Sequence, residues 1–418
     1  MLSAICLLPS ELSALTRPDD FNDRYDLREM VVLSRHSIRA PLSGNGSALA
    51  DLTSHKWTDW SAAPSELTSR GGALETIMGQ YFRKYLAQQG LFPENYVPST
   101  DDVNIYANSM QRTIATAQYF TSGFMPMANL RVNHRFDQSK MDPVFNPRLT
   151  KVNPAFKAKA MEQIESMGGK DGIRGINKNL EGSYALIAEV LDLKDSPAAK
   201  DKGMTAFDNY DTQISLNLGE EPGMKGSLKD ANSASDAFIL QYYEEPDSVK
   251  AAFGHKLSRE QWADIAKIKD VYGDVLFTAP VVAANVANPL LRYMYDELNS
   301  DARKFTYLVG HDSNIASVNA ALGVEEYELP DAIEKKTPIG CKLVMEKWLG
   351  KDGKEYVSLS LVYQTPYQLR NLALLDLDNP PMVFPLKLKG LEANADGLYL
   401  LDDVNRRFGE AFAAYEAI

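Results

Sequence analysis

Two arginines and a histidine stand close together in the run Ser34-Arg35-His36-Ser37-Ile38-Arg39-Ala40-Pro41. Arg35 and Arg39 are four residues apart, so in a helical turn they would share a face and could bind the oxygens of one phosphate. The two flanking cations are expected to lower the pKa of His36, which leaves a nitrogen lone pair available near neutral pH. A neutral imidazole beside a held phosphate could act as a nucleophile. The alternative is a solvated surface run without chemistry.

A second histidine lies in the segment Gly310-His311-Asp312-Ser313-Asn314, directly after an apolar run at residues 305–309. His311 could donate a hydrogen bond to an oxygen of the same phosphate. A phosphate dianion beside Asp312 would raise the pKa of this carboxyl, which could then give a proton to the leaving-group oxygen. Asp312 could instead be the N-cap of the following helix, because Asp, Ser and Asn are favoured there. His311 could equally be an ordinary loop histidine.

A third cationic group stands at the start of a predicted helix. Arg112 follows the apolar run at residues 103–107 and falls in the first turn of the helix expected from Ser109 onward. The N-terminus of a helix favours anions, so an arginine there opposes the helix dipole. An anion bound between Arg112 and the helix end would explain this position.

The three motifs occupy the same place relative to predicted strands. Apolar runs at residues 30–33, 103–107 and 305–309 are typical of strands buried in a parallel sheet, and helical patterns follow at 69–87, from 109 onward and at 313–322. In open α/β sheets, ligands bind outside the carboxyl ends of the strands. We therefore expect one phosphoryl-transfer site, made by Arg35, His36, Arg39, Arg112, His311 and Asp312.

The order of these elements indicates an α/β fold in which a mixed, mostly parallel sheet is flanked by helices. Residues 146–270 are mainly helical in pattern, and we expect an inserted helical domain between the two parts of the α/β domain, 21–145 and 271–418. Residues 1–20 are expected to be a signal remnant or an N-terminal arm. The glycine-rich run at 168–175 lacks the Lys-Ser or Lys-Thr of a phosphate-binding loop and is interpreted as a turn.

The composition excludes several other classes of protein. The 418 residues include 44 Lys and Arg against 56 Asp and Glu, a formal net charge of -12 that would repel nucleic acid. Two cysteines, Cys6 and Cys341, are too few for a disulfide framework, and the five histidines are too scattered for a metal-binding helix. No apolar stretch is long enough to cross a membrane. An anionic substrate must therefore bind to a local cluster of positive groups.

The remaining residues with reactive side chains have simpler interpretations. His55, His134 and His255 stand in polar surroundings and are expected to be solvated or to cap helices. Cys341 lies among apolar residues and is interpreted as a buried structural thiol. Asn45 begins a glycosylation sequence, Asn-Gly-Ser, although a turn explains this tripeptide equally well.

Taken together, the motifs resemble those of the histidine acid phosphatases, the second branch of the histidine phosphatase superfamily. The first motif of that family is Arg-His-Gly-x-Arg-x-Pro and the second is His-Asp. Here they stand as RHSIRAP and HD, with Ser37 in place of the glycine. Further similar stretches lie at residues 67–86, 106–120, 141–147, 236–244, 308–317 and 337–343. The resemblance covers nearly the whole chain, and within the branch it is closer to the glucose-1-phosphatases than to the phytases.

This resemblance implies a phosphoglycerate-mutase-like fold and a role for each residue of the site. His36 would form a phosphohistidine, and Asp312 would be the proton donor. The phosphate would be held by Arg35, Arg39, Arg112 and His311. Glu244 would occupy the position where glucose-1-phosphatases carry a glutamate near the substrate. No metal or other cofactor is implied, because the arginines neutralise the phosphate charge.

The expected activity is hydrolysis of a small-molecule phosphomonoester, with glucose 1-phosphate as the expected substrate. A phytase and a catalytically silent sugar-phosphate binding protein are the alternatives. The binding protein would need only the arginines, so His36 and Asp312 favour the enzyme. A phosphoglycerate-mutase-like transferase would typically use a glutamate as the proton donor. The resemblance to this family implies a periplasmic or secreted enzyme. The N-terminal apolar run at 2–9 resembles the tail of a secretory signal, although no Lys or Arg precedes it. A homodimer is one of the oligomeric states that the sequence leaves open.

Overall fold

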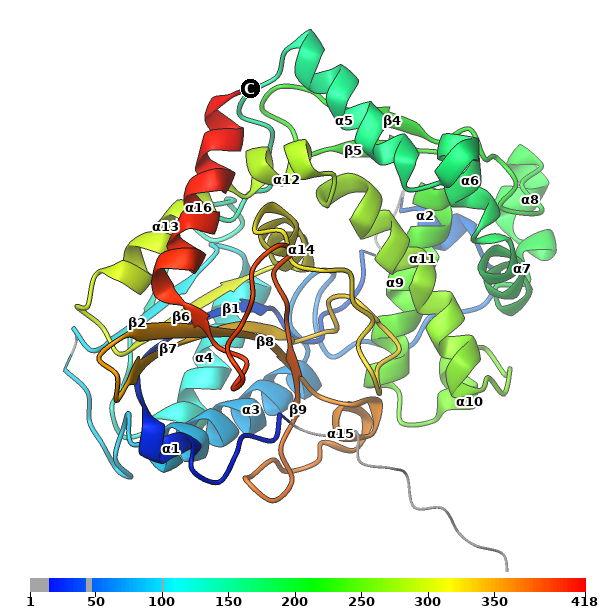
Figure 1. The fold of residues 1–418 in the computed structure, drawn as a ribbon. Coiled ribbons are helices and arrows are strands. Elements are labelled where there is room, and N and C mark those ends of the chain that lie inside the picture. Colours follow the sequence, from blue (N-terminus) through cyan, green and yellow to red (C-terminus); the bar gives the residue numbers. More distant parts are fainter. Residues whose placement is uncertain (1–14, 43–46, 100) are drawn as a thin grey trace, which may run out of the picture.

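A computed structural model describes residues 15–42, 47–99 and 101–418 (Figure 1). Cys6, Asn45 and most of the N-terminal segment 1–20 lie outside the described residues. Within the described ranges, no helix combines the length and the apolar character needed to cross a bilayer.

A mixed β-sheet forms the centre of the fold. Its strands are β1 Tyr25–Arg35, β2 Val103–Ala107, β3 Val132–Asn133, β6 Phe305–Gly310, β7 Lys342–Gly350, β8 Glu355–Tyr363, β9 Met382–Pro385 and β10 Tyr399–Leu400. In spatial order they run β10-β8-β7-β1-β6-β2-β3, with β9 paired to β8. The pairings of β1 with β6, β6 with β2 and β2 with β3 are parallel. The strands from the last part of the chain, β7 to β10, join by antiparallel pairing.

The structure confirms the three strands predicted from apolar runs. β2 coincides with residues 103–107, and β6 extends one residue beyond the predicted 305–309. β1 is longer than the run at 30–33, because it pairs with β7 from Tyr25 to Ser34 as well as with β6. Hydrogen-bonded neighbours on both sides thus extend this strand beyond its apolar centre.

Helices cover both faces of the sheet, which confirms the predicted α/β class (Figure 1). Met30 and Val32 pack with α3 (Ser69–Gln88) and α4 (Gln111–Phe124) on one face. Val31 and Leu33 pack on the other face with α13 (Asn288–Asn299), α14 (Asp312–Ala321) and α16 (Leu401–Glu416). Burial on both faces explains why the centre of β1 is apolar without alternation.

Helices also make up most of the chain between α4 and α13, drawn mainly in green beside the sheet in Figure 1. They share a large apolar core to which α9 and α11 contribute many residues. Their bounds are α5 Pro154–Ser166, α6 Gly172–Lys178, α7 Glu181–Val190, α8 Pro197–Lys202, α9 Ser227–Glu244, α10 Ser248–Ala251, α11 Arg259–Phe277 and α12 Pro280–Val286. Two 3₁₀ turns, Gly169–Asp171 and Leu193–Asp195, and a hairpin of β4 Gln213–Ser215 and β5 Gly223–Lys225 connect them. The domain division at 146 and 270 stays a prediction.

The remaining helices are short and lie near the sheet or the cleft described below. Their bounds are α1 Phe21–Arg24, α2 Ala48–Asp51 and α15 Pro366–Asn371. The first half of the glycine-rich run at 168–175 forms the predicted turn, with a 3₁₀ helix at Gly169–Asp171, and the run then continues into the first turn of α6.

Candidate active site

The carboxyl ends of β1, β2 and β6 meet at one edge of the sheet, as their parallel pairing requires. Arg35 is in register with Gly310. The backbone continues this ladder beyond the strands, because the amide of His36 donates to the carbonyl of Gly310 over 3.0 Å. The amide of Asn108 likewise donates to Val309 over 2.9 Å. The three sequence motifs are thereby brought together.

The imidazole of His36 is buried, and the backbone fixes one of its ring nitrogens. Nδ1 lies 2.8 Å from the carbonyl oxygen of Ser37, and because a carbonyl can only accept, Nδ1 carries the hydrogen. The lone pair is therefore on Nε2. Burial and the charges of Arg112 and Arg39 hold the pKa of His36 well below its ordinary value, so the ring is neutral. A neutral imidazole with this lone pair has the properties of a nucleophile.

His311 lies beside His36, with the ring centroids 5.6 Å apart and the ring planes at 71°. The Oδ1 of Asn108 accepts from the backbone amides of Ser109 and Asp142, so its Nδ2 must be the atom that faces His311 Nε2 at 2.7 Å. Nε2 of His311 therefore accepts, and Nδ1 carries the ring hydrogen. Burial and the nearby arginines lower the pKa of His311 to about 3. This histidine therefore presents a neutral N–H donor at Nδ1.

Two arginines of the site have a buried Nε without a hydrogen-bond partner among the described residues. They are Arg35 and Arg112. A buried donor without a partner is costly, and an anion placed between these groups would satisfy both. Arg112 lies in the first turn of α4, as the sequence predicts. Burial and repulsion from Arg39 lower its pKa to about 10, so it still carries its charge near neutral pH.

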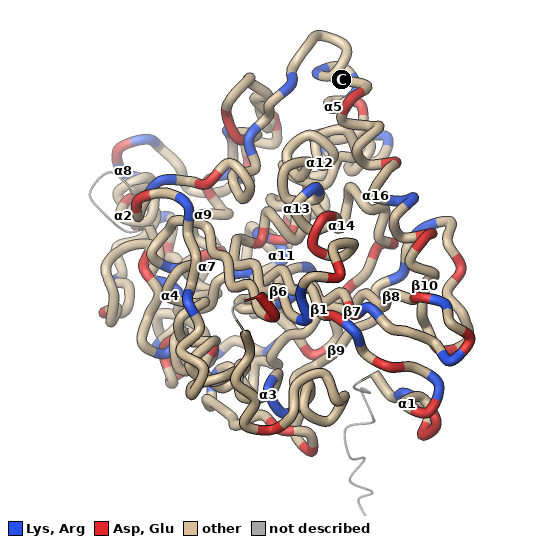
Figure 2. The backbone as a smooth tube through the Cα atoms, turned by 90° about the vertical axis from the view of Figure 1, so that its left-hand side faces the viewer, with Lys and Arg blue, Asp and Glu red and all other residues tan. Residues whose placement is uncertain are grey.

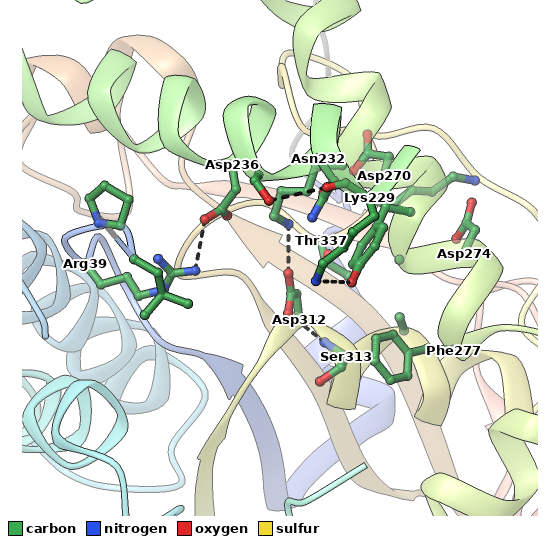
Figure 3. Close-up of a pocket in the computed structure, with 18 of the residues that line it drawn as sticks. Arg39, Lys229, Asn232, Asp236, Asp270, Asp274, Phe277, Asp312, Ser313 and Thr337 are labelled. Carbon is green, nitrogen blue, oxygen red and sulfur yellow. Dashed lines mark hydrogen bonds and ion pairs between the residues drawn. The ribbon is translucent and has the colours of Figure 1, made fainter. Parts of the chain in front are cut away.

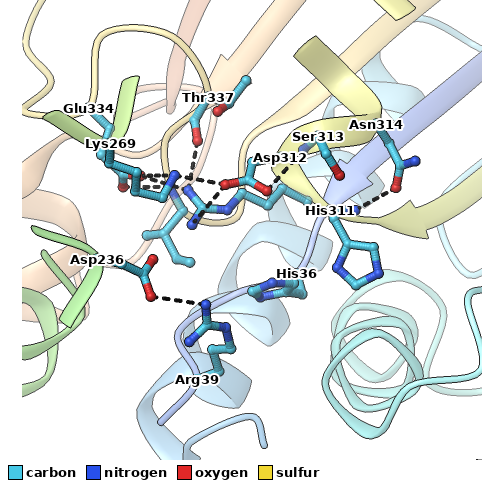
Figure 4. Close-up of polar contacts among 12 residues, drawn as sticks. His36, Arg39, Asp236, Lys269, His311, Asp312, Ser313, Asn314, Glu334 and Thr337 are labelled. Atoms are coloured by element: carbon cyan, nitrogen blue, oxygen red, sulfur yellow. Dashed lines mark hydrogen bonds and ion pairs between the residues drawn. The ribbon is translucent and has the colours of Figure 1, made fainter. Parts of the chain in front are cut away.

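Arg39 reaches the site in a different way from the one expected. The chain after β1 is not helical, and Arg39 instead forms an isolated bridge with Leu67. The expectation that Arg35 and Arg39 share a helix face is therefore wrong, although both charges still act on His36. The guanidinium of Arg39 lies 3.0 Å from the carboxylate of Asp236 on α9. This ion pair connects the first motif to the helices beside the sheet (Figure 4).

Asp312 is the first residue of α14 and not its N-cap. His311 has the N-cap position, and its amide donates to Oδ1 of Asn314 over 2.9 Å. The interpretation of Asp312 as a helix cap is therefore wrong. Asn314 thus binds the amide of the N-cap residue, while the carboxylate of Asp312 lines the cleft.

The carboxylate of Asp312 accepts one hydrogen bond on each oxygen. Oδ1 accepts from the amide of Ser313 over 2.9 Å, and Oδ2 accepts from Nζ of Lys269 over 2.8 Å. The enclosed position would raise the pKa of Asp312, but Lys269 and Arg35 hold it well below its usual range. A phosphate bound beside Asp312 would add negative charge and so raise the pKa of this carboxyl.

The sequence patterns missed two buried charged residues, Lys269 and Glu334. The carboxylate of Glu334 lies 2.7 Å from the guanidinium of Arg35 and 3.4 Å from Nζ of Lys269. Its other oxygen accepts from the hydroxyl of Tyr243 over 3.2 Å and from the amide of Ile339 over 2.9 Å. Glu334 thus fixes the orientation of Arg35. Neither residue stands in a motif: Lys269 falls within the regular helical pattern of α11, and Glu334 lies in a loop.

Glu244 has its hydrogen bond outside the phosphate-binding residues, and its place near the substrate stays a prediction. It is the last residue of α9, and its carboxylate accepts from Thr68 Oγ1 over 2.8 Å. Burial raises its pKa. Asp236, about two turns earlier on the same helix, is the acidic residue of this stretch that contacts the site through Arg39.

A cleft of about 460 Å³ opens beside Asp312, between α9, α11 and α14 (Figure 3). This volume is typical of small-molecule sites. Its charged lining is balanced between four acidic and four basic residues of the described chain, namely Asp236, Asp270, Asp274 and Asp312, and Arg39, Lys229, Lys269 and Lys336. Positive and negative residues are interspersed over the rest of the fold as well (Figure 2). Such a cleft suits an uncharged, hydroxyl-bearing group next to a phosphate.

Glu221, which the sequence patterns also missed, adds a carboxyl near the same cleft. Burial raises its pKa, and the negative charge of Asp312 raises it further, while Arg112 acts in the opposite direction. Glu221 stands in the turn before β5, where its acidic neighbours give no local signal of this position.

The other histidines and the cysteine have contacts outside this site. Nε2 of His55 lies 2.6 Å from Asp192, His134 is hydrogen bonded to a backbone carbonyl, and His255 is half-buried. Cys341 is buried, as predicted, and burial raises the pKa of its thiol to about 12. In the described ranges, no three His, Cys, Asp or Glu side chains are grouped so that they could hold a metal ion.

Comparison with known proteins agrees with this geometry. The sequence model of the histidine phosphatase superfamily (branch 2) matches residues 26–362. A glucose-1-phosphatase from Salmonella typhimurium (strain LT2) is 40% identical over 95% of this chain and 94% of its own. A phytase from Escherichia coli (strain K12) is 27% identical over 97% of this chain and 96% of its own. The apo phytase of Hafnia alvei superposes with a TM-score of 0.85 at 28% identity, covering 96% of this chain and 99% of its own.

A mixed sheet with arginines and histidines gathered at the carboxyl ends of its parallel strands, together with these relatives, defines a phosphoryl-transfer enzyme. The chain belongs to the histidine phosphatase superfamily, branch 2, as the motifs RHSIRAP and HD predict. It is a phosphomonoesterase, which acts on a small-molecule substrate.

Proposed function

We propose that the protein hydrolyses glucose 1-phosphate to glucose and phosphate through a phosphohistidine on His36. The geometry of His36 carries the proposal: its Nδ1 is bonded to a carbonyl, which puts the lone pair on Nε2, beside arginines with unpaired nitrogens. The choice of sugar is supported by the relative named glucose-1-phosphatase, which is 40% identical to this chain. A cleft of balanced charge also suits an uncharged sugar.

The reaction has two steps. In the first, Nε2 of His36 attacks phosphorus, the bond from phosphorus to the sugar oxygen breaks, and Asp312 gives its proton to that oxygen. In the second, water attacks the phosphohistidine, Asp312 takes a proton from the water, and the nitrogen–phosphorus bond breaks. Because Asp312 must begin protonated, we expect the highest activity at acidic pH.

The phosphate oxygens are held throughout by residues that keep the same charge in both steps. Three guanidinium groups and the Nδ1–H of His311 stabilise the charge on these oxygens, which is the main source of catalysis in phosphoryl transfer. The guanidinium groups belong to Arg35, Arg39 and Arg112.

A phytase is the second candidate, because the Hafnia alvei phytase superposes on this chain with a TM-score of 0.85. Inositol hexakisphosphate carries several phosphates outside the one that reacts. These would meet Asp236, Asp270 and Asp274 as well as Lys229 and Lys336, so the cleft offers them no excess of positive charge. We therefore expect a lower kcat/KM for phytate than for glucose 1-phosphate.

We also propose that the enzyme is exported to the periplasm or secreted, which is supported by the apolar run at residues 2–9 and by the acidic optimum expected from Asp312. Fractionation of expressing cells tests this, and enzyme found only with cytoplasmic markers would contradict it. Light scattering of the purified protein tests whether it forms a homodimer.

The activity is tested by phosphate release at acidic pH, with and without EDTA, from glucose 1-phosphate and from phytate. His36→Ala should abolish turnover and the acid-labile phosphoenzyme. His134→Ala is the matched control, because this exposed histidine is bonded only to a backbone carbonyl. A phosphoenzyme retained in His36→Ala would contradict the nucleophile. A higher kcat/KM for phytate would transfer the assignment to the second candidate.

A further inference from the structure

A chain of buried charges lies behind the carboxylate of Asp312, and the two steps above do not use it (Figure 4). Nζ of Lys269 lies 2.8 Å from Oδ2 of Asp312 and 3.4 Å from Oε2 of Glu334. The side chain of Lys269 is 9% exposed and that of Glu334 is fully buried. A lysine so placed has lost most of its hydration, so its position depends on these two carboxylates.

We propose that Lys269 is a positioning residue that keeps the carboxylate of Asp312 ionised and oriented between the two steps of the reaction. This inference rests on the proposed function. Lys269 acts through its hydrogen bond to Asp312.

The hydrogen bonds of Asp312 carry the argument. Oδ1 accepts from the amide of Ser313 and Oδ2 accepts from Lys269. An ammonium group has donors only, and so does a backbone amide. Both carboxylate oxygens are therefore acceptors, so in this arrangement Asp312 is the base that the second step requires.

The first step requires the opposite form of Asp312. A phosphate held by Arg35 would bring negative charge close to the carboxylate, and this charge would compete for Arg35 and Lys269. The pKa of Asp312 would then rise, and the residue would take up a proton as the substrate binds. After the sugar has left, Lys269 would again stabilise the ionised form.

Lys269 keeps its own charge because carboxylates lie on two sides of it. Burial and Arg35 act to lower its pKa, but Asp312 and Glu334 raise it above its ordinary value. Glu334 is fixed in turn by Tyr243 and by the amide of Ile339. Lys269 is thus held by Glu334, whose own hydrogen bonds to Tyr243 and Ile339 do not involve the reacting groups.

Several other charged or titratable groups face Asp312 and share in setting its proton affinity. Those that act on it from the neighbouring elements are Arg35 and His36 at the end of β1, Arg112 on α4, Glu221 before β5, Lys269 on α11, His311 beside it, and Cys341 before β7. Lys269 differs from the rest of this set because its ammonium donates directly to Oδ2.

Removal of the Lys269 charge should shift two pH dependences to higher pH: the alkaline limb of kcat/KM and the acidic limb of phosphohistidine hydrolysis. Lys269→Met should raise the pKa of Asp312 by about 1 to 3 units, the effect of an adjacent opposite charge. The first step needs protonated Asp312, so the alkaline limb of kcat/KM for glucose 1-phosphate should move to higher pH. The second step needs the ionised form, so hydrolysis of the phosphohistidine should slow at acidic pH and phosphoenzyme should accumulate.

The experiment measures the pH profile of kcat/KM and the rapid-quench phosphoenzyme level in the purified full-length enzyme. Lys269→Arg should restore the wild-type limb, because a guanidinium can also donate to Oδ2. Lys229→Met is the matched control: Lys229 lines the same cleft, but its Nζ lies 3.3 Å from the hydroxyl of Tyr272. The Lys229→Met substitution also removes one positive charge from the cleft, and we expect the alkaline limb of kcat/KM to stay at its wild-type pH.

A uniform loss of rate in Lys269→Met, with both limbs unchanged, would overturn the proposal, and so would an equal shift in Lys229→Met. Circular dichroism and thermal melting show whether Lys269→Met folds. If it does not, Lys269→Gln, which keeps polarity without charge, is measured for the same shift and decides in its place. Failure of the proposed function is recognised separately, because the wild-type enzyme would then form no phosphoenzyme that depends on His36.

Discussion

The side-chain amide of Asn108 donates to Nε2 of His311 over 2.7 Å, and this bond determines which ring nitrogen of His311 carries its hydrogen. The amide cannot be turned around, because its oxygen already accepts two backbone amides. His311 therefore keeps its hydrogen on Nδ1. With a pKa of about 3, this donor does not titrate over the pH range in which the enzyme is expected to act.

Asn108→Asp tests this relationship. The aspartate can still accept the two backbone amides, but it replaces the donor to Nε2 by an acceptor and so reverses the tautomer of His311. We expect KM for glucose 1-phosphate and the Ki of inorganic phosphate to rise about tenfold, the effect of roughly 1.4 kcal/mol. Asn104→Asp is the charge-matched control, because Asn104 lies on β2, just before Asn108 in the chain, and donates to Tyr293. Equal effects of the two variants would refute the role of the tautomer.

Arg112→Met should remove one of the guanidinium groups that hold the phosphate. Loss of one preorganised donor to a developing negative charge typically reduces the rate by about 10² to 10³. We expect a loss of that size in kcat/KM, together with weaker inhibition by phosphate. Arg135→Met is a suitable control, because the Arg135 guanidinium stacks over the ring of Tyr106. A change of less than about threefold in Arg112→Met would place this arginine outside the site.

Asp312→Asn should affect substrates according to their leaving groups. The amide oxygen can still accept a hydrogen bond, but the residue cannot transfer a proton. We expect kcat/KM to fall much more for glucose 1-phosphate than for 4-nitrophenyl phosphate, whose leaving group needs little protonation. Equal losses on both substrates would show that Asp312 positions other groups and does not act as the acid.

Glu244→Gln should change kcat/KM by less than about twofold, because its carboxylate contacts Thr68 at the start of α3. Asp236→Asn, on the same helix, should have a larger effect because it weakens the ion pair that holds Arg39. The comparison uses kcat and KM on glucose 1-phosphate with thermal melting of both variants. A large loss of kcat in Glu244→Gln with unchanged melting would return this glutamate to the site.

Local sequence patterns predict the strands and the positions of most candidate site residues. Apolar runs of four or five residues locate β1, β2 and β6, and the strand ends then locate His36, His311 and Arg112. Parallel pairing then brings these residues together, because it places the carboxyl ends of the three strands at one edge of the sheet. This part of the site depends on short-range signals and on one rule of topology.

The supporting charges could not be found in the same way. Arg35 and Glu334 are 299 residues apart, and Lys269 and Asp312 are 43 apart, so no spacing in the sequence connects them. The local rule for helix caps also fails at α14: His311 has the N-cap position, so Asp312 lies inside the helix and lines the cleft. Tertiary packing, not local spacing, brings the supporting charges together.

The position of β1 in the sheet has a consequence for the synthesis of the enzyme. Its hydrogen-bonded neighbours are β6 and β7, which begin at residues Phe305 and Lys342, whereas His36 is made near the start of translation. Pairing over so many residues is slow and must wait until both later strands have left the ribosome. The nascent chain therefore carries its nucleophile before the proposed proton donor, Asp312, has been made. A phosphatase built in this order would spare the sugar phosphates of the compartment in which it is made.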